Sequence, residues 1–544
     1  MLHSIPDSFT PKLVTVLREG YGLAALRADA VAGLTVAIVA LPLSMAIAIA
    51  SGVAPQHGLY SAIVGGFVVS LLGGSWFQIG GPAGAFIVLV LATVTAHGLD
   101  GLFLATMLSG VILLAAGLLR LGTFVQYVPY PVTVGFTSGI AVIIFASQIR
   151  DLLGLQLLGP EPGALLQKLP VLVQALPTFS VWAAGVAAFT VGLIVWLRRV
   201  RPRWPVLLIA VASASVGAAL LGLPVETIGT RFGGIPSGLP APSLPDLSLA
   251  RVIAVLPAAL TFALLGSIES LLSAVVADTM TGRRHRSNIE LVAQGAANIV
   301  TPIFGGFCVT GTIARTATNV RAGARGPVAG MLHSVFLLLF MLLAAPLASY
   351  IPLAALAGLL ATVAWNMAER HAFAALVRAS RADAAVVLVT FGLTLFRDLT
   401  EGIVAGFCLS ALLFLHRMAG SATVERAPLP DADAMDVVTL RITGAFFFGS
   451  AGAVAAALDR IAERPRAFVL DVSDLGAMDS TAVAALRAFA QRAQAAGTLL
   501  YVAGANVGIR RTLLAQGLRS PLLRFGSDVD SARMAAQGRL AAVP

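Results

Sequence analysis

The sequence predicts an all-α membrane domain with fourteen spans, arranged as two inverted repeats of seven, followed by a small cytoplasmic α/β domain. Of the 544 residues, 58% are hydrophobic and only 11% are charged, and the mean hydropathy is +0.90. Apolar stretches recur at close to the ~20 residues that cross a bilayer as a helix. Beyond about residue 418 this pattern gives way to alternating strands and helices. Most of the chain is therefore expected to be surrounded by lipid.

The N-terminal residues 1–28 are expected to form a cytoplasmic segment, because they lack the apolar core and small-residue cleavage site of a removable signal peptide. The membrane domain is predicted over residues 29–418. Its first repeat covers about residues 29–221, and its second repeat covers about residues 251–417. The clearest predicted spans are Ala30–Ala50, Leu102–Leu119, Val181–Leu197 and Val328–Ala345.

The basic residues follow the predicted topology. The net charge is +10, and 34 of the 36 basic residues are arginines. If the N-terminus lies inside, the loops that face the cytoplasm hold thirteen basic residues of the membrane domain, and the opposite loops hold five. This asymmetry predicts that both termini lie in the cytoplasm of a bacterial inner membrane. Positive charge confined to short loops between spans does not indicate nucleic-acid binding.

The cysteines, histidines and other residue types that bind metals or catalyse reactions do not occur at the spacing of a metal site or a catalytic site. Cys308 and Cys408 lie in or beside apolar spans, which indicates neither a disulfide framework nor a cysteine metal site. The histidines of the membrane domain lack metal-ligand spacing. Neither domain contains a nucleophile paired with a base, so we expect no metal, no cofactor and no enzyme activity.

A domain boundary is predicted where the apolar character ends. Residues 419–434, with Pro428, Pro430 and several aspartates, are expected to form a linker, and residues 435–544 a small α/β domain. The predicted strands of that domain are Val437–Ile442, Ala467–Val472 and Leu499–Ala503. The predicted helices are Ala451–Ala462, Thr481–Ala496 and Gly508–Gln516.

Two glycine-rich segments interrupt the membrane domain. Ile79–Phe86 precedes a short third span, and Gly305–Arg315 precedes a short tenth span, which is the third span of the second repeat. Because a repeat of seven spans, an odd number, ends on the opposite side of the membrane from where it began, the second repeat must be inverted relative to the first. Unwound backbone is tolerated at membrane depth only where protein or a water-filled cavity satisfies it. Paired interruptions in inverted repeats therefore predict a binding site near the middle of the bilayer.

The chemistry predicted for this site is anion binding. A helix that begins inside the membrane presents unpaired N–H groups and the positive end of its dipole. Ala83, Gly84 and Gly311 leave room for an anion to approach the backbone. Arg315 would add a positive field, since a charge at mid-membrane costs ~2.5–3.5 kcal/mol on insertion scales and needs a partner or a task. The alternatives are glycines that serve only close helix packing, and an Arg315 that extends to the interface.

Glu269 is a second charge within a predicted span, the first of the second repeat. It can carry a proton, and the charges nearby would couple its protonation to the presence of an anion. We therefore expect a proton on Glu269 and an anion beside Arg315 to cross together. The alternative is a permanent Glu269–Arg315 ion pair that holds two helices in register.

Several motifs resemble the SulP sulfate permeases, which form solute carrier family 26. They are Leu41-Pro42, the sequences APQHGLYS at residues 54–61 and GGPAGAF at residues 80–86, and TGTIARTA at residues 310–317 followed by AGARGPVAG at residues 322–330. LDVS at residues 470–473 and MDST at residues 478–481 resemble a STAS domain. The resemblance covers nearly the whole chain. It implies a core domain that moves against a gate domain, a homodimer in the lipid bilayer, and an anion site between the third and tenth spans.

The resemblance also implies roles for particular residues. Glu269, with Ser273 one turn on, occupies the acidic position of the eighth span, where sodium-coupled bicarbonate relatives are expected to have aspartate; a glutamate favours protons over sodium. Leu43 stands where many members have glutamine, which leaves sulfate, bicarbonate, chloride, nitrate or a dicarboxylate as substrates. The implied substrate-binding residues are Leu43, Ser44, Ala83, Gly84, Ala85, Phe86, Gly311, Thr312, Ala314 and Arg315.

The function predicted on these grounds is proton-coupled anion symport by an elevator-like mechanism. Sodium-coupled bicarbonate uptake, anion exchange and an uncoupled anion channel are the alternatives within this fold. A nucleobase permease would not explain Arg315 or the STAS-like domain, and a membrane-anchored signalling protein would not need paired broken helices. Ser480 matches the phosphorylated serine of stand-alone STAS proteins, but the following residues differ, so an N-cap role is expected instead.

Overall fold

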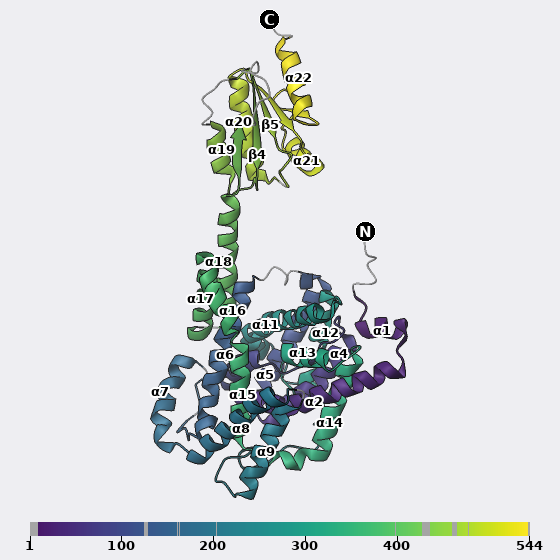
Figure 1. Cartoon of the computed structure of the whole chain (residues 1–544), viewed down its shortest axis with the longest axis vertical. Coiled ribbons are helices and arrows are strands. Elements are labelled where there is room, and N and C mark those ends of the chain that lie inside the picture. The colour runs from purple at the N-terminus through teal and green to yellow at the C-terminus, as the bar shows by residue number, and fades with distance from the viewer. Residues whose placement is uncertain are drawn as a thin grey trace. The chain divides into compact units, whose positions relative to one another are not determined.

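The computed structural model of the chain (Figure 1) describes residues 9–123, 129–159, 161–162, 164–202, 204–397, 399–426, 436–459, 465–476 and 478–541. Half of the predicted linker, residues 427–434, lies outside the described residues. The chain forms two compact units, Met1–Phe407 and Cys408–Pro544.

The first unit is helical. Its helices are α1 (Lys12–Gly20), α2 (Leu23–Ala50), α3 (Pro55–Tyr60), α4 (Gly66–Leu72), α5 (Ile87–Leu118), α6 (Tyr130–Leu153), α7 (Leu165–Ala175), α8 (Val181–Val200), α9 (Val206–Leu220), α10 (Ile228–Phe232), α11 (Leu249–Thr281), α12 (Ser287–Val300), α13 (Ile313–Arg321), α14 (Val328–Ala348), α15 (Leu353–Met367), α16 (Arg370–Ala379) and α17 (Arg381–Phe396). Helix α18 (Leu399–Ala419) continues into the second unit, and the first unit also holds two short strands, β1 (Gly80–Gly81) and β2 (Thr310–Gly311).

The helices match the predicted spans. Within the described residues, seven helices are long and apolar enough to cross a membrane: α2, α5 with the turn before it, α6, α8, α11, α14 and α18. The left-handed backbone of Gly98, with φ 71° and ψ −175°, divides α5 into two spans. The remaining expected spans are shorter and correspond to α3 joined to α4, α9, α12, α13, α15 and α17.

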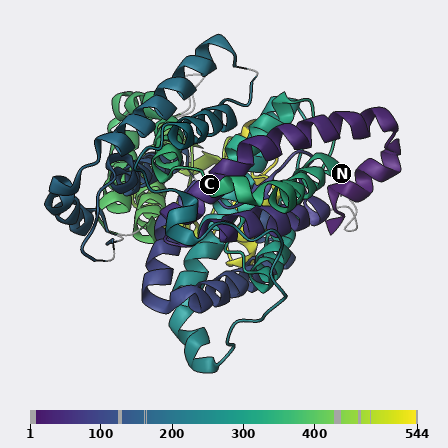
Figure 2. The same cartoon turned by 90° about the horizontal axis from the view of Figure 1, so that it is seen from below.

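The helices of the first unit pack in two groups, consistent with a core and a gate. Helices α2, α4, α5 and α11–α14 pack on one another, and α6, α8, α15 and α17 form the second group (Figure 2). Glycines allow the closest approach within the first group. A Cβ on Gly295 of α12 would lie 2.5 Å from the Leu114 nitrogen and 2.7 Å from the Gly110 oxygen of α5. The backbones of α5 and α12 are therefore nearly in contact, as small residues permit in membrane proteins.

The second unit is the predicted α/β domain. Its sheet has the order β3 (Thr423–Arg426), β4 (Val437–Thr443), β5 (Ala467–Asp471), β6 (Leu499–Ala503) and β7 (Arg524–Gly526), with β3 antiparallel to β4 and the other neighbours parallel. Its helices are α19 (Ala451–Asp459), α20 (Ser480–Ala495), α21 (Val507–Ala515) and α22 (Val529–Ala541). The three predicted strands and three predicted helices are present, and the sequence analysis missed β3, β7 and α22.

Alternating side chains bury both faces of this sheet. Leu440 and Leu470 pack with helices α19–α21 on one face, whereas Val469 and Tyr501 pack with α22 on the other. Asp471, at the end of β5, accepts hydrogen bonds from Ser473 Oγ at 2.5 Å and Arg441 Nε at 2.8 Å. Burial raises the pKa of Asp471, but these hydrogen bonds outweigh burial and lower it below the ordinary value.

The N-cap of α20 corrects one prediction. The side chain of Asp479, not that of Ser480, accepts the hydrogen bond from the Ala482 nitrogen, at 2.8 Å. Ser480 is the first residue of the helix, so its expected capping role was wrong.

We expect Gly295→Ala to lower the thermal unfolding midpoint of the purified protein. The new methyl group would collide with backbone atoms of α5, and overpacking of this kind costs about 1–3 kcal/mol. Gly217→Ala in α9 is the matched control, because a Cβ there meets nothing within 4 Å, and we expect it to be neutral or slightly stabilising. Equal midpoints for the two variants would contradict the close packing of α5 on α12.

Candidate functional site

The two broken segments meet as a small antiparallel sheet. Gly80 pairs with Gly311, and Gly81 pairs with Thr310. The Thr312 nitrogen extends the pairing with a 2.9 Å hydrogen bond to the Ile79 oxygen. The sequence predicted both interruptions but not this pairing, which joins the two repeats at one place. Backbone groups that helices leave unpaired at membrane depth are thereby partly satisfied.

A helix begins directly after each strand. The chain passes from β1 through Ala83 into a turn of 3₁₀ helix (Gly84–Phe86) and then α5, and from β2 through Thr312 into α13. Ala83 and Thr312 have extended backbone angles, and neither start has a side-chain cap hydrogen bond. The Thr312 hydroxyl instead donates to the Ile79 oxygen at 3.0 Å. Both helix starts therefore keep N–H groups that can meet an anion.

Arg315 lies under this pair of strands with 1% of its surface exposed. Its Nη2 donates to Ser44 Oγ at 3.1 Å and to the Pro82 oxygen at 3.3 Å. Among the described residues, its Nη1 and Nε atoms have no hydrogen-bond partner. A Cβ on Gly81 would lie 2.3 Å from Nη1, so glycine is required there to admit the guanidinium. The arginine is buried beside the helix starts and does not extend to the interface.

Glu269 does not pair with Arg315. In the part of the chain that the structure describes, no ion pair joins them, and the carboxylate of Glu269 has no hydrogen-bond partner. The side chain is half-buried on α11, on the helix face of Gly266 and Ser273. The Gly266 oxygen accepts from Thr310 Oγ1 at 2.9 Å, and Ser273 Oγ donates to Thr316 Oγ1 at 3.0 Å. Glu269 is thus held close to β2 and α13 as an unpaired acid.

The other predicted substrate residues surround the two helix starts. Leu43 is buried in the hydrophobic core, next to Ser44. Gly84 faces the second group of helices, since a Cβ there would lie 3.2 Å from Ile144 Cδ1 of α6 and 3.6 Å from Met367 Sδ of α15. The remaining predicted residues are Ala83, Ala85 and Phe86, which are buried, Gly311, which is buried under Gln78, and Ala314, which is exposed.

Polar side chains that the sequence analysis missed support the unwound backbone. Asn298 of α12 donates to the Val309 oxygen at 2.8 Å and accepts from the Val309 nitrogen at 2.9 Å. Ser61 accepts from the Phe307 nitrogen at 2.8 Å, and Asn319 donates to the Phe77 oxygen at 2.9 Å. Such residues are recognisable as polar side chains within otherwise apolar spans, which need a reason to be buried. The thiol of Cys308 is 1% exposed in the same segment, whereas Cys408 is exposed.

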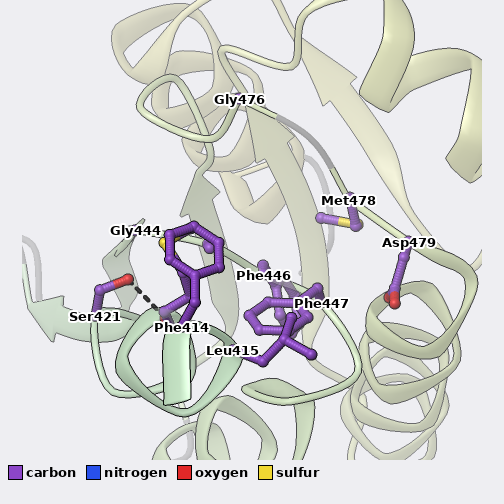
Figure 3. Close-up of a pocket in the computed structure, with 11 residues that line it drawn as sticks. Phe414, Leu415, Ser421, Gly444, Phe446, Phe447, Gly476, Met478 and Asp479 are labelled. Atoms are coloured by element: carbon purple, nitrogen blue, oxygen red, sulfur yellow. Dashed lines mark hydrogen bonds between the residues drawn. The ribbon is translucent and has the colours of Figure 1, made fainter. Parts of the chain in front are cut away.

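A separate cavity of about 580 Å³ lies in the second unit (Figure 3). Its walls are Phe414, Leu415, Met418, Ser421, Gly444, Ala445, Phe446, Phe447, Gly476, Met478 and Asp479. The polar groups are already engaged: Ser421 Oγ donates to the Met418 oxygen at 2.7 Å, and Asp479 accepts from the Phe448 nitrogen at 2.9 Å. This apolar cavity offers nothing to bind a small anion. Within the described residues, no cluster of His, Cys, Asp and Glu could hold a metal ion.

Comparisons with known proteins agree with this architecture. The "Sulfate permease family" model matches residues 26–390, and the "STAS domain" model matches residues 432–532. The chain is 41% identical over 475 residues to the putative sulfate transporter YvdB of Bacillus subtilis, covering 86% of this chain and 89% of YvdB. It is 32% identical over 519 residues to the bicarbonate transporter BicA of Synechocystis sp., covering 90% of each chain. The murine anion transporter Slc26a9 in its inward-facing state has the same fold, with a TM-score of 0.86 at 17% identity over 99% of this chain and 96% of that one.

We expect Arg315→Gln to weaken anion binding by about tenfold or more, because it removes a buried positive charge that lies beside β1 and at the start of α13. Arg321→Gln is the matched control, since Arg321 is an exposed residue at the far end of the same helix. The measurement is the half-saturating anion concentration of each variant in proteoliposomes. An unchanged value for Arg315→Gln would remove this residue from the site.

Proposed function

The chain belongs to the sulfate permease family, and on that premise we propose that it is a secondary active transporter that carries a small anion together with a proton. Members of this family are transporters, so the chain is a multi-pass anion transporter and not an enzyme. The observation that most supports the proposal is the meeting of two uncapped helix starts over the buried Arg315. The proposed substrate is sulfate, bicarbonate or a dicarboxylate, and the names of YvdB and BicA are in line with the first two.

The electrostatics of the site favour a negative ligand. Two helix N-termini contribute partial positive charge, and Arg315 adds a full charge with two N–H-bearing atoms unpartnered among the described residues. The Ser44 hydroxyl is held by the same guanidinium, at 3.1 Å from Nη2. No carboxylate of the described residues forms an ion pair with Arg315. An anion would therefore compensate a positive field that this part of the chain leaves open.

Glu269 is the proposed coupling residue. An ionised carboxylate without a partner is unfavourable at membrane depth, so protonation of Glu269 removes the free-energy cost of its negative charge. An anion beside Arg315 repels the charged form of Glu269 and so favours its protonation, and by reciprocity a protonated Glu269 favours anion binding. The two ligands then bind together. A glutamate at the position where sodium-coupled relatives are expected to have aspartate gives a proton rather than sodium as the proposed partner ion.

Alternating access would arise from movement of the first group of helices against the second. The anion site lies in the first group, and Gly84 at one helix start faces Ile144 and Met367 of the second group. A rigid movement of the first group would carry the site past these side chains from one side of the membrane to the other, as in an elevator. The proposed setting is a homodimer in a bacterial inner membrane with both termini in the cytoplasm, and the proposed repeats remain residues 29–221 and 251–417.

Uptake of radiolabelled sulfate, bicarbonate and succinate into proteoliposomes, with and without an inward proton gradient, tests this function. We expect the proton gradient to drive uptake of at least one anion. We expect Glu269→Gln to abolish this gradient-driven accumulation, since glutamine cannot release a proton, while exchange of internal for external anion persists. Glu19→Gln, at an exposed position of α1, is the matched control and should behave as the unmodified chain.

The other outcomes identify the alternatives. Accumulation driven by a sodium gradient alone would indicate sodium coupling. Uptake that follows only the membrane potential would indicate an uncoupled channel. Proton-driven uptake that survives Glu269→Gln would remove this residue from the coupling mechanism.

A further inference from the structure

A second acid of the membrane unit, Glu290, has no role in the transport steps described above. It belongs to α12 and has no exposed surface. Its Oε2 accepts from the backbone nitrogens of Gly74 at 2.8 Å and Ser75 at 3.1 Å. Its Oε1 accepts from Gln294 Nε2 at 3.1 Å and, more weakly, from Ser270 Oγ at 3.4 Å. Four donors around one carboxylate are the complement that an ionised carboxylate accepts.

The first pair of these contacts fixes one broken segment. Gly74 and Ser75 follow Gly73, the C-cap of α4, and belong to the unwound stretch that leads to β1. Both residues are buried, so their N–H groups would lack a hydrogen-bond partner without Glu290. A Cβ on Gly74 would lie 2.2 Å from the Arg286 oxygen, so this stretch is also packed tightly against the start of α12. Glu290 therefore anchors the beginning of the segment that becomes the first helix start.

The second pair of contacts leads to the other broken segment. Ser270 Oγ, which contacts Glu290, accepts a 2.7 Å hydrogen bond from Gln78 Nε2. The Gln78 amide in turn lies directly on Gly311 of β2, where an added Cβ would fall only 1.7 Å from Nε2. A continuous series of contacts thus runs from Glu290 through Ser270 and Gln78 to the strand that precedes α13.

We propose that Glu290 is a positioning residue for the anion site, and that its carboxylate holds the two broken segments at a fixed mutual distance. This inference rests on the proposed function and deepens it. Glu290 contacts no anion, because its four donors already surround it. It acts through the backbone of Gly74 and through Gln78. Its role thus differs from the coupling role proposed for Glu269, which has no partner among the described residues.

Hydrogen–deuterium exchange of the full chain provides the first test. In Glu290→Gln, an amide nitrogen replaces one carboxylate oxygen and cannot accept a hydrogen bond. The hydrogen bonds from either Gln294 or the backbone nitrogens are therefore lost. We expect faster exchange in peptides that cover residues 74–81 and, through Ser270 and Gln78, also in those that cover residues 307–312. If Glu290 had only a local structural role, exchange would become faster only in the peptides that cover residues 74–81. Unchanged exchange over residues 307–312 would overturn the proposal, whether or not the chain transports an anion.

Transport kinetics provide the second test. With the anion that the unmodified chain carries, we expect Glu290→Gln to raise the half-saturating concentration about tenfold, with a smaller loss of maximal rate and unaltered dependence on the proton gradient. Gln78→Ala should also raise the half-saturating concentration. In the double variant, the loss of binding free energy should be smaller than the sum of the losses in the two single variants. Thr190→Val is the control, because Thr190 is buried but bonds only within its own helix α8.

The outcomes separate this proposal from the proposed function. An unmodified chain that carries none of the anions defeats the proposed function, while the exchange experiment still decides the role of Glu290. Additive effects of Glu290→Gln and Gln78→Ala, or an unchanged half-saturating concentration in both, would overturn the positioning role alone. If Glu290→Gln does not fold, Gln78→Ala alone must show the faster exchange at residues 307–312.

Discussion

The pairing of β1 with β2 is the interaction on which the rest of the membrane unit depends. Two residue pairs hold together segments more than two hundred positions apart in the chain. Unwound backbone has no water to bond with at this depth, so each strand satisfies the other, and Asn298, Ser61 and Glu290 satisfy the remainder. This support lets α5 and α13 begin directly after the paired strands, with no side-chain cap on either helix start.

The ionisable side chains of the membrane unit differ in how many hydrogen-bond partners they have. Arg315 gains two hydrogen bonds and retains two unpartnered atoms among the described residues, whereas Glu290 is surrounded by donors. The half-buried Glu269 has neither an ion pair nor a hydrogen bond in the described chain. Three ionisable groups of one helix bundle thus differ in how far the protein satisfies them. A fully satisfied group is suited to structure, while a partly satisfied group is suited to bind a ligand or a proton.

Hydropathy and glycine spacing were enough to predict the spans, the two breaks and the α/β domain. They could not predict β1 and β2, because two-residue strands carry no periodicity of their own. Two of the three missed elements of the second unit have related causes: β3 lies in polar sequence assigned to the linker, and β7 is three residues long. A Glu269–Arg315 ion pair was a reasonable alternative from charge alone. The structure instead directs Arg315 toward Ser44 and Pro82, a choice set by tertiary packing that sequence spacing does not encode.

The position of Cys308 gives the chain a natural reporter. This thiol is one of only two in the sequence, and it is enclosed within the segment that leads to β2, whereas Cys408 is exposed. A small thiol reagent should therefore modify Cys308 only when the two-strand pairing loosens. The labelling rate of Cys308, with a Cys408→Ser variant to remove the other thiol, would measure how often that pairing opens.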